Sequence, residues 1–312
     1  MQIITLVIPF YNNHYNAVMA VNSALSQQLR DEYILKIIVV NDGSSKDSLD
    51  YINTKVADVA QIVTHEENMG RGNSINTGVS KSDSDYIIFM DSDCVFYDKD
   101  AIYAHIQALE RGADVSFGVV SSEKKGFWGD YTRFLEHNRI REAGQECNYL
   151  VLTSANLAIK RSVFERLGGF DKRYKKYGFE DRDLIARLLD TNANISFNPD
   201  IVVLHDGDSN LRVVSRKMME AGRYTSQYFI DSHLKRYLEM PYSKIDVRIH
   251  PIGFLLLSKI MIMLLPTFIF MSSMVISSKY YSNSFKRFLV KAVSASSFMI
   301  GTFYSRRDMQ DD

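Results

Sequence analysis

Cysteine and net charge are scarce in this 312-residue chain, and its first residues show no leader pattern. The two cysteines, Cys94 and Cys147, have no CxxC spacing, so neither a disulfide scaffold nor a structural zinc site follows from them. The 37 Lys and Arg residues balance 37 Asp and Glu residues, whereas a nucleic-acid-binding protein needs a basic excess. Residues 1–10 are apolar and lack the basic start of a secretory signal peptide. We therefore expect a cytosolic catalytic part with reduced thiols and no nucleic-acid partner.

The zero net charge is the sum of two unlike parts. Between residues 235 and 307 there are eleven Lys and Arg residues but two Asp and Glu residues, whereas the chain before them is acidic. Residues 252–276 contain one charge, Lys259, and are long enough to span a bilayer. Residues 285–303 have an amphipathic helical pattern with a basic side. This part of the chain indicates an anionic membrane surface as a partner.

The positions of the cations favour one membrane arrangement over the others. A spanning segment would carry Lys279, Lys286 and Arg287 across the membrane, against the positive-inside rule. A helix lying in the membrane plane would leave these cations beside anionic headgroups. We therefore expect a peripheral or monotopic protein on the cytoplasmic face of the inner (plasma) membrane. The alternative is a buried helix pair that forms a homodimer through the C-terminal helices.

Short runs rich in Ile and Val alternate with stretches of helical periodicity in the first half of the chain. This alternation predicts an α/β fold with a mixed, mostly parallel sheet that is flanked by helices. A hydrophobic helical extension follows at the C-terminus. The strands are expected at residues 3–10, 35–41, 60–65, 86–91 and 115–120.

Polar residues follow four of these strands, at positions 12–13, 42–45, 68–72 and 91–93. Each motif alone is typical of a turn or of the start of a helix. Ligands of parallel sheets bind beyond the carboxyl ends of the strands. Together, the motifs therefore predict a pocket with carboxylates, small residues and exposed backbone amides.

Asp91 and Asp93 are separated by a single residue after a strand, so both can face a divalent cation. Mn²⁺ and Mg²⁺ prefer oxygen ligands and usually keep phosphate oxygens and water in their coordination shells. The pair therefore indicates a cation that is shared with a diphosphate.

Five motifs, in this order along the chain, resemble those of family 2 glycosyltransferases. They are VIPFYNN (7–13), VVNDGSSKD (39–47), NMGRGNSINTG (68–78), FMDSD (89–93) and YGFEDRDLIARL (177–188). Members of this family are inverting, nucleotide-sugar-dependent enzymes with the GT-A fold. The resemblance implies a GT-A domain at residues 1–240, with a donor half at about 1–120 and an acceptor half at about 121–240. Residues 241–312 would form a membrane-associating helical region.

The resemblance also implies roles for individual residues. The residues expected to bind the nucleotide sugar are Pro9, Tyr11, Asn12, Asp42, Asn68, Gly70, Arg71, Asn76, Asp91 and Asn156. Those expected to bind Mn²⁺ or Mg²⁺ are Asp93, Asp91 and His205. Asp181 would be the catalytic base, and Glu180 would bind acceptor hydroxyls or orient the base. Trp128 and Arg182 are weaker candidates for acceptor contacts.

Structural roles stay open for several of these residues. His205 could simply end a strand and bond to the backbone, and Trp128 could belong to a core or interface. Glu180 and Asp181 could cap the N-terminus of a helix.

The expected activity is metal-dependent, inverting transfer of a hexose or N-acetylhexosamine from a UDP-sugar to a hydroxyl group. The acceptor would be a glycan or a polyprenyl-linked molecule in surface polysaccharide synthesis. One alternative is a sugar-1-phosphate nucleotidyltransferase, but that class needs a Gly-rich loop with Arg and Lys after the first strand, which residues 10–14 do not provide. The other alternative is a non-catalytic scaffold subunit that binds a nucleotide sugar.

Overall fold

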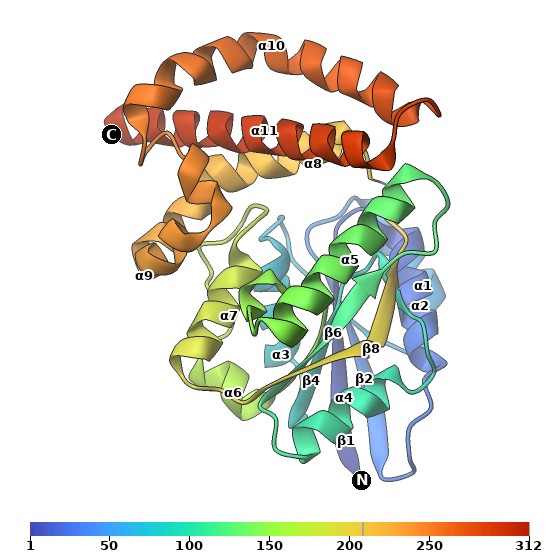
Figure 1. Cartoon of the computed structure of the whole chain (residues 1–312). Coiled ribbons are helices and arrows are strands. Elements are labelled where there is room, and N and C mark those ends of the chain that lie inside the picture. Colours follow the sequence, from blue (N-terminus) through green and yellow to red (C-terminus); the bar gives the residue numbers. More distant parts are fainter. Residues whose placement is uncertain (208, 312) are drawn as a thin grey trace. The chain divides into compact units, whose positions relative to one another are not determined.

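A computed structural model describes residues 1–207 and 209–311, which form two compact units (Figure 1). The first unit comprises Met1–Lys124, Thr132–Lys175 and Asp181–Gly207. The second comprises Lys125–Tyr131, Lys176–Glu180 and Asp208–Asp312. The expected division at residue 240 falls inside the second unit, because helices before this residue pack against a helix that follows it.

The first unit is built on an eight-stranded sheet in the order β3-β2-β1-β4-β7-β6-β8-β5. The strands are β1 (Gln2–Phe10), β2 (Tyr33–Asn41), β3 (Gln61–Thr64), β4 (Tyr86–Met90), β5 (Cys94–Phe96), β6 (Val115–Ser121), β7 (Asn156–Lys160) and β8 (Ile195–His205). The β4–β7, β6–β7 and β5–β8 pairs are antiparallel, and the other four neighbouring pairs are parallel. The predicted mixed, mostly parallel sheet is confirmed, and the five expected strands occur within two residues of their expected ends.

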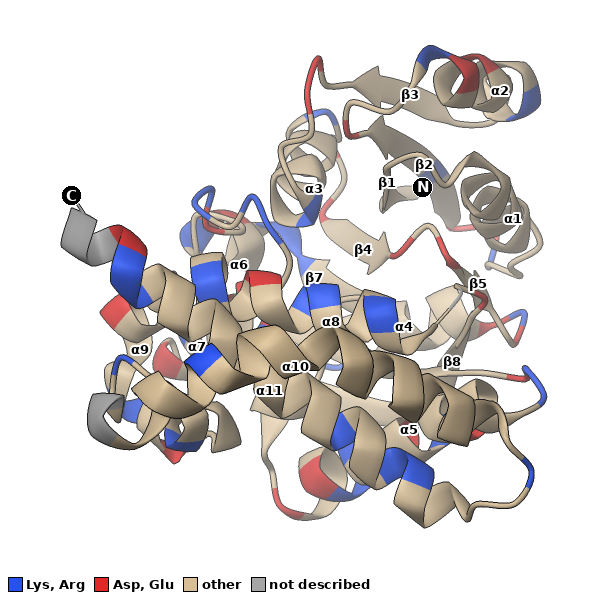
Figure 2. Cartoon of the chain, turned by 90° about the horizontal axis from the view of Figure 1, so that it is seen from above, with Lys and Arg blue, Asp and Glu red and all other residues tan. Residues whose placement is uncertain are grey.

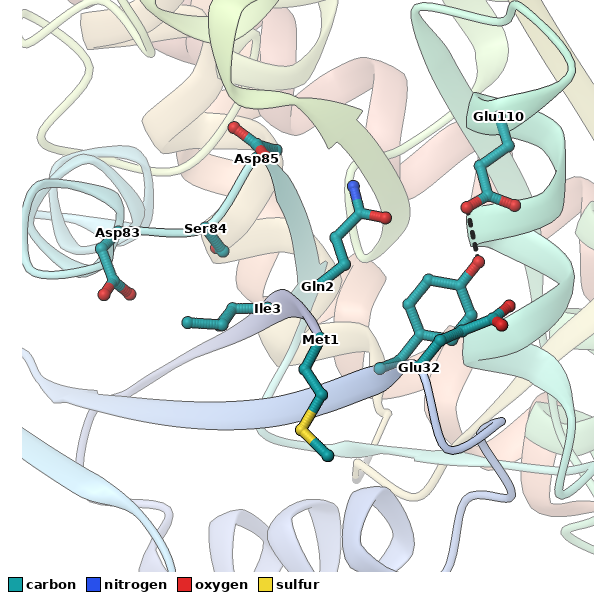
Figure 3. A pocket seen from close by; sticks show the side chains of 9 residues that line it. Met1, Gln2, Ile3, Glu32, Asp83, Ser84, Asp85 and Glu110 are labelled. Atoms are coloured by element: carbon teal, nitrogen blue, oxygen red, sulfur yellow. Dashed lines mark hydrogen bonds between the residues drawn. The ribbon is translucent and has the colours of Figure 1, made fainter.

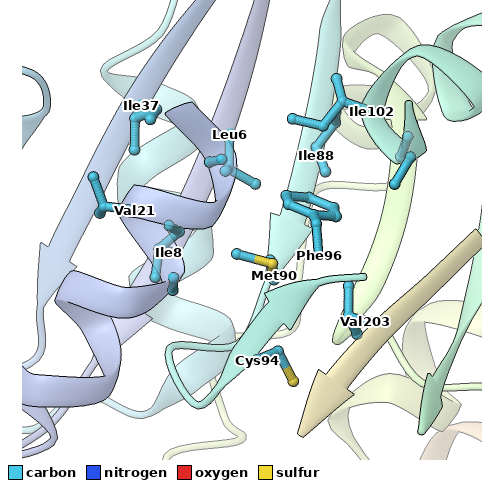
Figure 4. Close-up of a cluster of buried hydrophobic side chains, with 14 of the residues drawn as sticks. Leu6, Ile8, Val21, Ile37, Ile88, Met90, Cys94, Phe96, Ile102 and Val203 are labelled. Atoms are coloured by element: carbon cyan, nitrogen blue, oxygen red, sulfur yellow. The ribbon is translucent and has the colours of Figure 1, made fainter. Parts of the chain in front are cut away.

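Helices cover both faces of this sheet (Figure 1). They are α1 (His14–Leu25), α2 (Lys46–Val56), α3 (Arg71–Ser80), α4 (Ala101–Glu110), α5 (Phe127–Gln145), the short η1 (Tyr149–Val151), α6 (Arg161–Arg166) and α7 (Glu180–Asp190). Along β1, Leu6 and Ile8 join one hydrophobic cluster with Val21 of α1 (Figure 4), whereas Val7 joins a second cluster with Ile75 of α3. The strands are continuous apolar runs because both of their faces are buried.

The second unit is helical. Its elements are α8 (Leu211–Glu220), the π-helix η2 (Ala221–Thr225), α9 (Ser226–Glu239), η3 (Pro241–Ile245), α10 (Pro251–Ser277) and α11 (Asn283–Asp311). Helix α11 packs against α8 and η2 on one side and against α10 on another. Gly222 and Gly301 lie where α11 meets η2, and a Cβ atom on Gly222 would stand 2.4 Å from the carbonyl oxygen of Phe298. Two glycines are therefore needed for this close backbone approach.

Helix α10 is the one described helix that is long and apolar enough to cross a membrane, at Gly253–Ser277. Its buried residues are Ser258, Leu265, Ser272 and Ile276, and Phe268 and Ile269 are partly buried against a hydrophobic cluster of α8 and α11. Its other apolar side chains are half-buried or exposed; Met263, for example, is 80% exposed. Figure 2 shows how few charged residues α10 carries. The expected apolar helix is therefore present, with most of its surface uncovered by the described chain.

The apolar residues that the sequence pattern places on one side of helix α11 differ in burial along the helix. Leu289, Val293 and Met299 are buried, whereas Phe285 and Phe288 near its start are exposed. The buried part faces other helices of the second unit, because α8 and η2 pack there.

Candidate active site

Asp42 follows β2 and organises the loop that leads into α3. Its Oδ1 accepts a hydrogen bond from the Met69 amide at 2.8 Å and lies 3.0 Å from Nδ1 of His65. Its Oδ2 accepts one from the Gly70 amide at 2.9 Å, and the residue is 4% exposed. Gly70 has a φ of +90°, and a Cβ atom there would stand 2.9 Å from the Lys175 backbone. Asp42 and Gly70 therefore fix the backbone from which Arg71 extends.

The segments after β1 and β2 hold each other in place. The amide of Asn12, whose φ is +52°, donates to Ser44 Oγ at 2.9 Å. Its side-chain Oδ1 accepts from the Ser45 amide at 2.8 Å. Tyr11 is 52% exposed beside this contact, and Pro9 is buried within β1. The structure thus brings the first two predicted motifs together at the carboxyl edge of the parallel strands.

Arg71 joins two carboxylates that come from distant parts of the sequence. Its Nε donates to Asp91 Oδ1 at 2.5 Å, just after β4. Its Nη1 donates to Asp181 Oδ1 at 3.2 Å and to Ser154 Oγ at 2.8 Å. Ser154 in turn donates to Asp181 Oδ1, and Thr153 donates to Asp181 Oδ2 at 2.8 Å. We call Arg71, Asp91, Ser154, Thr153 and Asp181 the Arg71 cluster.

Within the Arg71 cluster, the pKa values of the two carboxylates are shifted in opposite directions. Burial is the largest influence on Asp91 and raises its pKa; the Arg71 guanidinium acts to lower it, and the charges of Asp93 and Asp181 act to raise it. Burial also acts to raise the pKa of Asp181. There the Arg71 guanidinium and the hydroxyls of Ser154 and Thr153 outweigh burial, so the pKa lies below its usual value. Asp181 is therefore an ionised carboxylate at neutral pH, and a proton acceptor.

Asp93 and His205 form a second polar pair, in which Nε2 of His205 lies 3.1 Å from Oδ2 of Asp93. The β5–β8 ladder sets this geometry, because it pairs Cys94 with His205. About 30% of each side chain is exposed, at 31% for Asp93 and 28% for His205. A Cβ atom on Gly207 would stand 2.7 Å from the imidazole. The pair can present an oxygen and a nitrogen to one cation.

Among residues 1–207 and 209–311, no group of three or more His, Cys, Asp or Glu side chains could hold a metal ion. Asp91, the third predicted metal ligand, is bonded to Arg71. The described chain thus offers two side chains, Asp93 and His205, as a candidate cation site.

Other predicted residues have contacts that favour structural roles. Asn156 is 1% exposed; its amide donates to the carbonyls of Val119 and Ile201, and its oxygen faces His105. Asn76 exchanges two hydrogen bonds with the backbone of Phe170. These contacts bind protein groups to each other and leave the donor-sugar prediction for Asn156 without support from its surroundings.

The acceptor candidates lie in different surroundings. Trp128 packs in the second unit beside a hydrophobic cluster that includes Leu211 and Val293. Glu180, the first residue of α7, accepts a hydrogen bond from the Gly178 amide at 2.9 Å, two positions before it. Arg182 is half-buried on α7, and Asn68 is exposed. The packing of Trp128 agrees with the structural alternative left open for it.

Sequence patterns did not identify three residues that the structure places in these networks: Thr153, Ser154 and His65. The hydroxyls of Thr153 and Ser154 hold Asp181 from 28 and 27 positions away in the chain. Thr153 and Ser154 belong to the sequence TSAN (153–156), in which the family resemblance assigns a role to the asparagine alone.

A cavity of about 560 Å³ lies at the other end of the parallel strands (Figure 3). It is lined by residues at the start of β1 and β2 and by four acidic side chains, Glu32, Asp83, Asp85 and Glu110. Tyr33 donates to Glu110 there at 2.5 Å. An acidic lining disfavours a diphosphate, so this cavity does not compete with the carboxyl edge as a donor site.

The described geometry agrees with comparisons to known proteins. The family described as "Glycosyl transferase family 2" matches residues 5–168. The chain belongs to glycosyl transferase family 2. A second family description, "N-terminal domain of galactosyltransferase", matches residues 137–207, which include Asp181. The GT-A prediction is thereby confirmed together with the family.

Several curated relatives are glycosyltransferases. The probable glycosyltransferase YdaM of Bacillus subtilis is 28% identical over 228 residues, which cover 68% of this chain and 52% of YdaM. The poly-beta-1,6-N-acetyl-D-glucosamine synthase of Staphylococcus aureus is 31% identical over 113 residues, covering 36% of this chain and 27% of the synthase. The chain thus spans about half the length of YdaM and a quarter of the synthase.

Solved structures share the fold. The mannosyltransferase PcManGT from Pyrobaculum calidifontis, solved with GDP-Man and Mn²⁺, superposes with a TM-score of 0.62 at 16% identity. The superposition covers 99% of this chain and 87% of PcManGT. TarS from S. aureus gives a TM-score of 0.50 at 16% identity, covering 72% of this chain and 40% of TarS.

Proposed function

We propose that this family 2 member transfers a hexose or N-acetylhexosamine from a UDP-sugar to a hydroxyl group, with inversion. The acceptor is a glycan or a lipid-linked molecule of a surface polysaccharide. The observation that carries this proposal is the Arg71 cluster, which brings the ionised Asp181 beside Asp91 at the carboxyl edge of the sheet. The GDP-Man complex of PcManGT supports a nucleotide-sugar donor, and the synthase among the relatives supports a polysaccharide product; the uridine nucleotide is part of the proposal.

In this reaction Asp181 is the general base. The acceptor hydroxyl attacks the anomeric carbon, and its proton passes to a carboxylate oxygen of Asp181 while the bond from that carbon to the diphosphate oxygen breaks. The hydrogen bonds from Thr153 and Ser154 fix the orientation of the carboxylate. An ionised, oriented carboxylate is what a single displacement requires.

Asp93 and His205 fit a divalent cation, because their donor atoms lie 3.1 Å apart and both side chains reach solvent. They would hold Mn²⁺ or Mg²⁺, whose remaining ligands are diphosphate oxygens and water. When bound, the cation stabilises the negative charge of the leaving UDP. Mn²⁺ in the PcManGT complex supports the use of a divalent cation.

The direct test is UDP release from a panel of UDP-sugars in the presence of Mn²⁺. We expect Asp181→Asn to lower turnover about 1,000-fold, since one positioned base contributes about 10² to 10⁴. UDP affinity, measured by calorimetry, should stay within about threefold of the wild-type value. The matched control is Asp58→Asn, at an exposed position after α2. Near-full turnover by Asp181→Asn would exclude the proposed base, and turnover that is unchanged by EDTA would exclude the metal.

We further propose that the second unit is monotopic at the cytoplasmic membrane face, with α10 in the plane of one leaflet. Helix α10 packs against α11, and α11 packs against α8. A spanning α10 would therefore take its neighbours into the hydrocarbon, including Arg287 of α11 and Arg216 of α8. A charge at the bilayer centre costs about 3 kcal/mol or more. An in-plane α10 leaves these cations at the headgroups or in water.

Vesicle flotation and surface labelling test this arrangement. We expect binding to anionic vesicles and loss of binding in Met263→Glu, whereas Met19→Glu, an exposed methionine of α1, should bind normally. In a Cys147→Ser background, Tyr280→Cys tests the side of the membrane, because Tyr280 is 96% exposed after α10. An impermeant maleimide should label it in sealed vesicles. Labelling only after detergent means that α10 spans, and a dimer without vesicle binding means that the helices pair with a second copy.

A further inference from the structure

We infer that Arg71 is a positioning residue that holds the base Asp181 in register with the donor-side carboxylate Asp91. This inference rests on the proposed function, because it needs Asp181 as the base. It goes beyond the nucleotide contact that the sequence motif indicates for Arg71.

The geometry of the guanidinium supports this role. Nε reaches Asp91 at 2.5 Å, and Nη1 reaches Asp181 at 3.2 Å, so two different donors of one rigid plane engage the two carboxylates. Ser154 adds a third point of contact, because it accepts from Nη1 and donates to Asp181. A lysine ammonium is a compact point charge on a flexible stem and cannot keep this spacing.

The backbone beneath Arg71 is fixed as well. Gly70, at the N-terminus of α3, lies against Lys175, and Asp42 binds the amides of Met69 and Gly70. The Arg71 side chain is 22% exposed. The guanidinium therefore extends from an anchored position into a partly enclosed site, where charged hydrogen bonds are strongest.

The same geometry links donor and acceptor chemistry. Asp91 follows β4 on the donor side, and the base Asp181 lies in the first turn of α7. Two like charges this close repel each other, and Arg71 compensates both. Without the guanidinium, Asp181 keeps the two hydroxyl donors but loses its fixed relation to Asp91. A misplacement of about 1 Å at a reacting group can cost about 100-fold in rate.

A double-mutant cycle between Arg71 and Asp181 tests the inference. We expect Arg71→Lys to lower kcat about 100-fold, since it misplaces the base, and to leave the Kd for UDP within about threefold. In the Asp181→Asn background, where the base is already gone, Arg71→Lys should change kcat by less than about threefold, because residues that act as a unit are not additive. Arg141→Lys, at a position 53% exposed on α5, is the matched control.

The outcomes separate the inference from the proposed function. If Arg71→Lys lowers kcat equally in both backgrounds, or mainly weakens UDP binding, Arg71 acts on the donor alone and the inference is wrong, although Asp181 stands as the base. If Asp181→Asn retains turnover, both fail. Should Arg71→Lys not fold, as judged by circular dichroism, Ser154→Ala enters the same cycle, since Ser154 joins the two groups. The decrease in kcat that Ser154→Ala causes must likewise disappear in the Asp181→Asn background.

Discussion

Acidification should destabilise this protein through one buried histidine, His105 of α4. Its Nδ1 lies 2.9 Å from Ser116 Oγ, and its Nε2 lies 3.0 Å from Asn156 Oδ1. The Asn156 amide is used by two carbonyls, so its oxygen faces the ring and Nε2 must carry the proton. His105 therefore joins α4 to β6 and β7, and burial, which lowers its pKa, keeps the ring neutral at neutral pH.

The magnitude follows from the pKa. Burial lowers the pKa of His105 to about 4 from 6.5. The unfolded chain therefore binds this proton more readily, so the full stability is present above pH 6.5 and is lost as the pH falls toward 4. At about 1.36 kcal/mol per pKa unit, the loss reaches about 3 kcal/mol below pH 4 and is about 2 kcal/mol at pH 5.

Urea unfolding in a mild detergent at pH 7.5 and pH 5.0, followed by far-UV circular dichroism, measures this loss. His105→Gln keeps an amide donor at the site but does not titrate, so it subtracts the contributions of all other groups. We expect wild type to lose about 2 kcal/mol more than His105→Gln between the two pH values. Equal losses would refute the buried neutral histidine.

Three further predictions concern positions where the structure allows little change. Gly222→Val should lower the melting temperature of the second unit by several degrees, because its Cβ would collide with the Phe298 carbonyl; Gly144→Val, where the nearest side-chain atom is 3.8 Å away, should not collide. Gly70→Ala should cost about 1 to 3 kcal/mol in urea unfolding, owing to its φ of +90°, and should weaken UDP binding in calorimetry. Arg248→Met should cost about 3 to 5 kcal/mol, because it leaves Asp246 buried without its cation; Asp246→Asn in the same chain should recover part of that loss.

The local sequence pattern was sufficient to predict the long strands of the sheet. Strands β1, β2 and β4 are continuous Ile- and Val-rich runs because helices bury both of their faces, and such a run is visible in any single segment. The same pattern overlooked β5, because a strand of three residues carries too little periodicity. The apolar helix α10 was equally visible, since its composition alone sets it apart.

In the candidate site, too, local sequence pattern predicted some features and not others. Ligands bind at the carboxyl ends of parallel strands, and this rule was sufficient to point to Asp42, Asp91 and Asp93 from residue order alone. Their contacts could not be predicted in this way, because Arg71 meets Asp181 across 110 positions in the chain. The hydroxyls of Thr153 and Ser154 carried no separate signal, since Ser and Thr are common in loops.

By itself, the sequence determined the family, the order of strands and helices, and the edge of the sheet at which chemistry was to be sought. These depend on residue type and spacing within short segments. Only the tertiary structure decided what each polar side chain bonds to: that Asn156 serves a buried histidine, that Asp42 holds a loop, and that Arg71 joins two carboxylates. A hydrogen bond requires its two atoms to lie within about 3 Å, and only the folded chain sets distances between residues that are far apart in sequence.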